Sequence, residues 1–275
     1  MSYKSILVFL DDGKSNEDRV NAAISMAVSH GAHLTGASLL SLKPETLNTD
    51  NVDLAALESK RMAERLVKEF ESKASMAGIE HDSLIVPGNS DESASKMAHH
   101  GRNADVIILA QPNPDGRNFT RMLSFAEEIM LYSGRPVMFI PYIGTNKIPF
   151  KKALISWDGT PAATRATYDA IPILKRTEEV TVLVVESKKQ LESKSDEQAE
   201  ALSRNLVRHG IHARVERISP GQATVASVIL NEVSHHDIDV LIMGGYGTPS
   251  LRQKILGGVT RSLLSTMLIP VLMAH

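Results

Sequence analysis

Two groups of glycines near the C-terminus have the types and the spacing to hold a phosphate. In GGYGTPSLRQKILGGVTR, nine residues separate Gly247, the last glycine of the group that begins at Gly244, from Gly257 and Gly258. Glycine lets the backbone approach an anion closely and turn its N–H groups inward, and a helix starting after the second group would add its free N–H groups and its dipole. The same glycines could form a tight turn and a helix boundary, so the pattern alone leaves both interpretations open.

The composition limits the other kinds of chemistry. Since the 275 residues include no cysteine, the chain can form no disulfide, no thiolate metal site and no cysteine nucleophile. The formal net charge of −2 provides no basic field, so we expect neither nucleic acid nor a membrane as a partner. The apolar run at the start of the chain is too short for a signal segment or a membrane span, which predicts a cytoplasmic protein.

No catalytic set stands in a recognisable motif. The chain has no serine, histidine and acid in such a context, and no lysine follows the glycines in Walker form. The pairs His99–His100 and His235–His236 each precede an Asp-Val strand, but adjacent side chains diverge on a helix, which favours a surface boundary over joint metal ligation. We therefore expect no catalytic residues and no metal site.

The chain repeats itself, which shows what positions these residues. Several landmarks recur in one order in both halves. The matched features are residues 104–116 with 238–250, residues 135–141 with 269–275, and the aspartates Asp11 and Asp158, which each close a short apolar run. The two gapless segments share an offset of 134 residues, and internal repetition explains such agreement where chance does not. The repetition predicts two domains, at 1–142 and 151–275.

Each copy reads as alternating strands and helices. Thr160 and Pro161 resemble a helix start in the second copy, and the strands are unalternated apolar runs, as expected of parallel strands covered by helices on both faces. We predict two tandem doubly wound, Rossmann-like α/β domains, each with a five-stranded parallel sheet. Ligands of such sheets bind beyond the carboxyl ends of the strands, where Gly244 follows the run VLIM directly.

These motifs resemble the universal stress protein family: an aspartate closing the first strand, Gly-x2-Gly after the fourth, nine residues, and a further glycine before the last helix. Both copies resemble the family along essentially their whole length, so the chain looks like a tandem member with adenine-nucleotide-hydrolase-like domains. The resemblance implies a stress-response regulatory protein that binds ATP or another adenine nucleotide, with Mg²⁺ as an optional companion. The implied nucleotide-binding residues are Asp158, Val185, Gly244, Gly247, Gly257, Gly258 and Thr260.

The sequence departs from the family pattern at one point of this motif. Gly258 stands where the family usually has serine or threonine, so a hydroxyl donor to phosphate is lost, although the backbone N–H remains. Thr260 matches another hydroxyl position and would substitute in part. The first copy has Ala110, Asn113, Leu123 and Ser124 in place of the second copy's four motif glycines. Because the first copy is expected to fold without them, the glycines of the second copy favour a ligand site, one per chain.

Other functions remain open at this stage. The alternatives are an interaction or scaffold module of the same family that binds no nucleotide, and a weak ATPase with slow turnover. The repetition also predicts that the end strands, residues 137–140 and 271–274, pair within the chain to form a pseudo-dimer. Protein partners and further homo-oligomers are not specified by the sequence.

Overall fold

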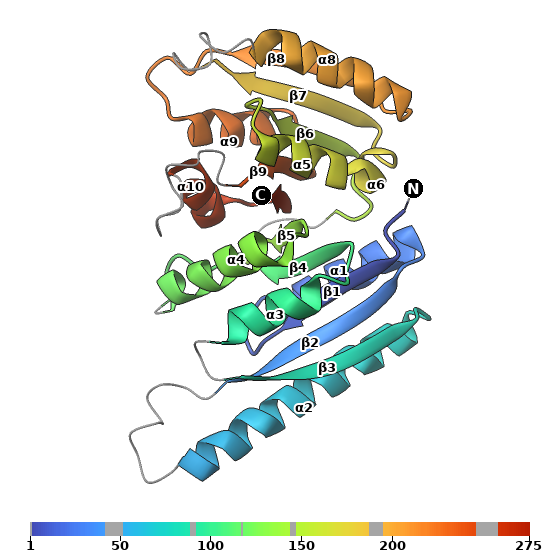
Figure 1. Ribbon diagram of the computed structural model, residues 1–275, viewed down its shortest axis with the longest axis vertical. Coiled ribbons are helices and arrows are strands. Elements are labelled where there is room, and N and C mark those ends of the chain that lie inside the picture. The colour runs from blue at the N-terminus through green and yellow to red at the C-terminus, as the bar shows by residue number, and fades with distance from the viewer. Residues whose placement is uncertain are drawn as a thin grey trace. The chain divides into compact units, whose positions relative to one another are not determined.

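The chain divides into two compact units. The computed structural model describes residues 2–41, 52–88, 92–116, 118–143, 147–186, 195–245 and 258–275 (Figure 1). The N-terminal unit holds Ser2–Ala110 and Asp115–Tyr142, and the C-terminal unit holds Ile143–His275 together with Gln111–Pro114. The predicted domain boundaries at 142 and 151 remain predictions, because compactness alone does not show that either part folds by itself.

The N-terminal unit alternates strands with helices. Its elements are β1 (Ser5–Leu10), α1 (Asn16–His30), β2 (His33–Ser41), α2 (Val52–Met76), β3 (His81–Gly88), α3 (Ser93–Gly101), β4 (Val106–Ala110), α4 (Phe119–Ser133) and β5 (Val137–Ile140). Every neighbouring pair of these strands is parallel, and their order is β3-β2-β1-β4-β5. The chain therefore moves outward from β1 in one direction, returns to β4 and continues in the other.

The C-terminal unit repeats this topology. Its described elements are β6 (Lys152–Ser156), α5 (Pro161–Asp169), α6 (Ile171–Leu174), β7 (Glu179–Val185), α8 (Ser195–Arg208), β8 (Ala213–Ile218), α9 (Val225–His235), β9 (Val240–Gly244), α10 (Gly258–Thr266) and β10 (Val271–Ala274). The strands are again parallel, in the order β8-β7-β6-β9-β10. The prediction of two doubly wound parallel α/β folds is confirmed, and the pairing of the end strands stays a prediction.

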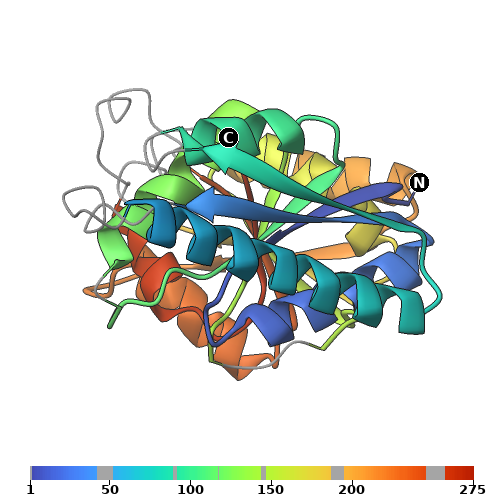
Figure 2. The same ribbon diagram turned by 90° about the horizontal axis from the view of Figure 1, so that it is seen from below.

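The core of each unit is its sheet. Residues 6–10 of β1, all of β5 and β10, and four of the five residues of β9 are buried. Burial of consecutive residues requires cover on both faces, since successive side chains point to opposite sides of a strand. In the N-terminal unit α1 and α2 cover one face of the strands, and α3 and α4 cover the other (Figure 2). This explains the unalternated apolar runs of the sequence.

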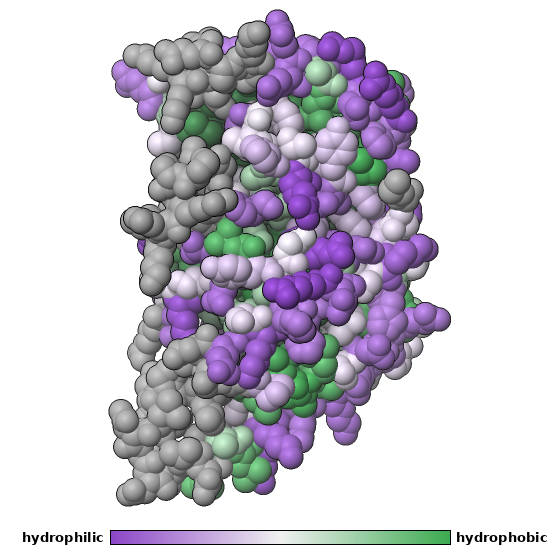
Figure 3. All heavy atoms as spheres, in the orientation of Figure 1, coloured by the Kyte–Doolittle hydropathy of each residue, from purple (hydrophilic) through white to green (hydrophobic). Residues whose placement is uncertain are grey.

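The surface of the described chain is largely polar. The face in Figure 3 carries mostly hydrophilic residues with apolar residues between them. Of the helices that the structure describes, none combines the length and the apolar character that crossing a bilayer requires.

Candidate functional site

The candidate site lies at the carboxyl edge of the C-terminal sheet, where the strand order reverses. The chain runs outward from β6 through β7 to β8 and then returns to β9 on the other side of β6. Ser156, the last residue of β6, pairs with Leu183 of β7 and Met243 of β9, so all three strands end at nearly the same level. Three predicted site residues lie along this edge: Asp158, Val185 and Gly244. The fold thus brings together residues that are up to 86 positions apart in the sequence.

The carboxylate of Asp158 is held by the turn that starts α5. Its Oδ1 accepts a hydrogen bond from the backbone N–H of Thr160 at 3.0 Å and another from the Thr160 hydroxyl at 2.6 Å. Thr160 is also the N-cap of α5, since its Oγ1 accepts from the backbone N–H of Ala163 at 3.2 Å. Asp158 is exposed, and within the described part of the chain no cationic side chain pairs with it. The carboxylate is therefore fixed in place and open to a ligand that donates hydrogen bonds.

The corresponding aspartate of the N-terminal unit is already neutralised. Oδ2 of Asp11 lies 2.9 Å from Nη2 of Arg19, whose side chain is completely buried. Nε of Arg19 also donates to the carbonyl of Phe9 at 2.7 Å, and the guanidinium lies 5.9 Å from the centre of the Phe9 ring. The fifth residue counted from the N-cap is Arg19 in α1 and Thr164 in α5, so the C-terminal unit lacks this cation. The N-terminal unit therefore keeps the aspartate, but the carboxylate of Asp11 is paired with Arg19 and is not open to a ligand.

Gly244 has a packing reason to be glycine. A Cβ added to it would lie 2.5 Å from the backbone nitrogen of Ala163 and 2.7 Å from the carbonyl carbon of Ala162, both in the first turn of α5. Such contacts are far shorter than van der Waals distance and involve backbone that cannot move aside. The fold therefore requires glycine at residue 244, contrary to the prediction that the motif glycines are not needed for folding.

The length of the strand-to-helix turn gives the physical reason for this difference between the two units. The N-cap Thr160 comes two residues after Asp158, whereas Ser15, at the N-cap of α1, comes four residues after Asp11. The shorter turn brings the start of α5 close to the end of β9. The N-terminal unit, with its longer turn, accommodates alanine at residue 110.

The start of α10 provides the other described part of the motif. Gly258 is exposed, and a Cβ added to it would meet no heavy atom of the described residues within 4 Å, so their packing does not require glycine here. Thr260 is only 3% exposed, which gives its side chain a packing role whether or not it contacts a ligand. Gly247 and Gly257 lie outside the described residues. The free N–H groups of the first helical turn remain available to an anion, as at any helix N-terminus.

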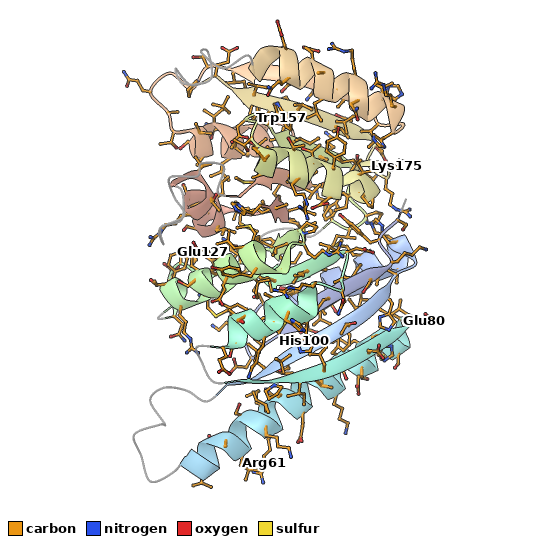
Figure 4. The ribbon with its side chains drawn as sticks, viewed as in Figure 1. Arg61, Glu80, His100, Glu127, Trp157 and Lys175 are labelled. Atoms are coloured by element: carbon orange, nitrogen blue, oxygen red, sulfur yellow. The ribbon has the colours of Figure 1, made fainter. Side chains whose placement is uncertain are left out.

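Two buried side chains limit what the edge can offer to a ligand. Val185 is 3% exposed, so only its backbone could contact a bound molecule. Trp157 is 6% exposed and lies inside the C-terminal unit (Figure 4), and its indole N–H has no hydrogen-bond partner in the described part of the chain. Trp157 therefore acts as a core aromatic at the end of β6.

A surface cavity of about 370 Å³ lies elsewhere, in the N-terminal unit. Its lining includes Asp82 and Leu84 of β3 and His100 of α3, and the latter is labelled in Figure 4. Ser5, the first residue of β1, also lines it, which puts the cavity toward the amino ends of the strands. It contains none of the predicted site residues.

Residues 149–275 match the model of the Universal stress protein family. Residues 149–275 therefore contain a universal stress protein domain. The match falls on the half of the chain that carries the glycine motif, so the resemblance inferred from the motifs is confirmed for this half. Among curated proteins, no sequence match to the chain was found.

Solved structures extend the fold to both halves. A universal stress protein from Archaeoglobus fulgidus DSM 4304 aligns with 98% of this chain and 97% of its own, at 18% identity and a TM-score of 0.75. A functionally unknown protein from Pseudomonas aeruginosa PAO1 aligns with 98% of this chain and 92% of its own, at 15% identity and a TM-score of 0.61. At these identities the likeness shows a shared tandem fold and does not extend to the binding of ligands.

Proposed function

We propose that the C-terminal unit binds an adenine nucleotide at the carboxyl edge of its sheet, and that the chain serves as a stress-response regulatory protein. In this proposal the Asp158 carboxylate accepts hydrogen bonds from the ribose hydroxyls, and the backbone at Val185 contacts the base. The motif glycines and the start of α10 hold the phosphates, as the family resemblance implies. ATP with Mg²⁺ is the fullest form of this ligand, and the cytoplasmic location accompanies the proposal as a prediction of the sequence.

One observation carries the proposal: the two equivalent aspartates have opposite environments. Asp11 is paired with a buried guanidinium, whereas Asp158 is exposed and has no cationic partner in the described part of the chain. The Asp158 carboxylate stabilises the turn before α5 through Oδ1, and within the described part of the chain no cation compensates its charge. It suits a ligand with hydroxyl donors, which is what a ribose offers.

The experiment compares these two aspartates in the full chain. Small molecules released by denaturing gently purified protein are identified by mass spectrometry, and ATP, ADP and AMP are then titrated calorimetrically. Asp158→Asn should lower nucleotide affinity at least tenfold, because a charged hydrogen-bond acceptor contributes about 1.5 kcal/mol or more. Asp11→Asn is the matched control and should leave affinity unchanged, provided that thermal melts show both variants folded. Equal losses in both variants would contradict the assignment to the C-terminal unit.

The packing role of Gly244 favours a second candidate. If Gly244 is glycine only to admit α5, the motif loses part of its evidence for phosphate binding, and the chain could act as a scaffold module that binds no nucleotide. Absence of released nucleotide, together with no calorimetric response to any of the three nucleotides, would select this alternative. A weak ATPase activity would need a catalytic base, and Asp158 is an exposed acid at this edge.

A further inference from the structure

A second group of polar side chains lies between the edge strand β8 and the end of α9. It consists of Glu216 on β8, Glu232 on α9 and His236, the residue that follows α9; we call it the β8–α9 cluster. Nε2 of His236 lies 3.2 Å from Oε2 of Glu232 and 3.9 Å from Oε2 of Glu216. One ligand atom from each of the three side chains lies within 4.8 Å of the other two. None of these residues belongs to the candidate nucleotide site.

Two of the three spacings, those from His236 to each glutamate, approach the edges of a tetrahedral metal site. Zinc binds imidazole nitrogen and carboxylate oxygen at about 2.0–2.2 Å, so neighbouring ligand atoms of a tetrahedron lie about 3.3–3.6 Å apart. The two observed distances fall within a few tenths of an ångström of that range, and side-chain rotation alone can supply such a shift. Glu232 and His236 are four residues apart at the end of one helix, which keeps them on the same face.

Two cations lie beside the cluster: Arg214, and Lys152, whose Nζ donates to the backbone carbonyl of His236 at 3.3 Å. Nη2 of Arg214 pairs with the other carboxylate oxygen of Glu216, Oε1, at 3.2 Å, and its Nε donates to the hydroxyl of Thr181 at 2.9 Å. The side chains of the cluster are 14–34% exposed, with Glu232 the least exposed. A cation can therefore enter from solvent, and the partial burial strengthens its attraction to the carboxylates.

We propose that the β8–α9 cluster binds one zinc ion, which clamps the edge strand β8 to α9. The imidazole ligand and the small ligand number select a borderline transition ion such as Zn²⁺ over Mg²⁺, which prefers an octahedron of oxygens. The fourth position is left to water or to an acidic group from outside the chain. The proposal does not depend on nucleotide binding.

The first test measures metal binding by the full chain. Calorimetric titration with ZnCl₂ should give one site per chain, Co²⁺ should give the visible absorption bands of a four-coordinate site, and Mg²⁺ should not compete. The changes His236→Gln and Glu232→Gln should each weaken Zn²⁺ binding at least tenfold. His100→Gln is the matched control, because His99–His100 is the equivalent histidine pair in the N-terminal unit, and it should leave binding unchanged. Absence of saturable Zn²⁺ binding would overturn the proposal. Equal affinities for Zn²⁺ in all three variants would also overturn it.

The second test separates a metal site from a simple ion-pair network. Arg214→Gln removes a cation that competes for Glu216, so a metal site predicts tighter Zn²⁺ binding and a larger rise in melting temperature on adding Zn²⁺. If the three side chains only form ion pairs with a protonated His236, the same change would give no gain in Zn²⁺ affinity. That result would also overturn the proposal.

Discussion

Restoring a hydroxyl at the start of α10 should strengthen nucleotide binding. Gly258 stands where the universal stress protein family usually has serine or threonine. A Cβ added to Gly258 would meet no heavy atom of the described residues within 4 Å. Gly258→Ser should therefore be accepted without strain. A hydroxyl that donates to a phosphate oxygen contributes about 1.5 kcal/mol, which corresponds to a roughly tenfold lower Kd for ATP.

Gly258→Ala is the control, because it adds the same Cβ and the same loss of backbone freedom without the hydroxyl. The assay is calorimetric titration of wild type and both variants with ATP and with adenosine. The gain of Gly258→Ser over Gly258→Ala should appear for ATP and vanish for adenosine, which has no phosphate. Equal affinities of the serine and alanine variants for ATP would refute the placement of phosphate at this helix start.

Four further substitutions test the packing and the motif. Gly244→Ala should destabilise the fold by about 1–3 kcal/mol in urea unfolding, because its Cβ would overlap the backbone of α5; a loss below the error of the measurement would refute the packing explanation. Arg19→Met should lower the free energy of unfolding by about 2–3 kcal/mol in the same assay. This loss is smaller than that for a fully buried ion pair because the side chain of Asp11 is 21% exposed. An unchanged stability would show that the ion pair does not stabilise the fold. Gly247→Val and Gly257→Val should each abolish measurable nucleotide binding in calorimetry while circular dichroism stays native, whereas unfolding would indicate that these glycines serve turns.

Much of the fold and the position of the candidate site could be predicted from the sequence. Continuous apolar strands, helix-start residues such as Thr160 and the internal repeat each carry local information, and parallel topology then places Asp158, Val185 and Gly244 at one edge. Comparison of the two copies also predicts that only the C-terminal unit carries the motif glycines at this edge. These features depend on neighbours in sequence or on rules that apply to every doubly wound sheet.

The remaining features depend on three-dimensional proximity that no local pattern specifies. Arg19 interrupts the apolar face of α1, but nothing in the sequence says that it reaches Asp11 through the core. The packing of Gly244 follows from the length of a turn more than 80 residues earlier. The sequence does not predict the β8–α9 cluster, because Glu216 reaches His236 from a strand 20 positions away.

The central claim is one open adenine-nucleotide site per chain, in the C-terminal unit. Its most direct test is the stoichiometry of a calorimetric titration of the full, nucleotide-free chain with ATP. The open Asp158 and the neutralised Asp11 predict one molecule of ATP per chain. Two equivalent sites would contradict the loss of the site in the N-terminal unit, and no binding of ATP, ADP or AMP would contradict the proposed function.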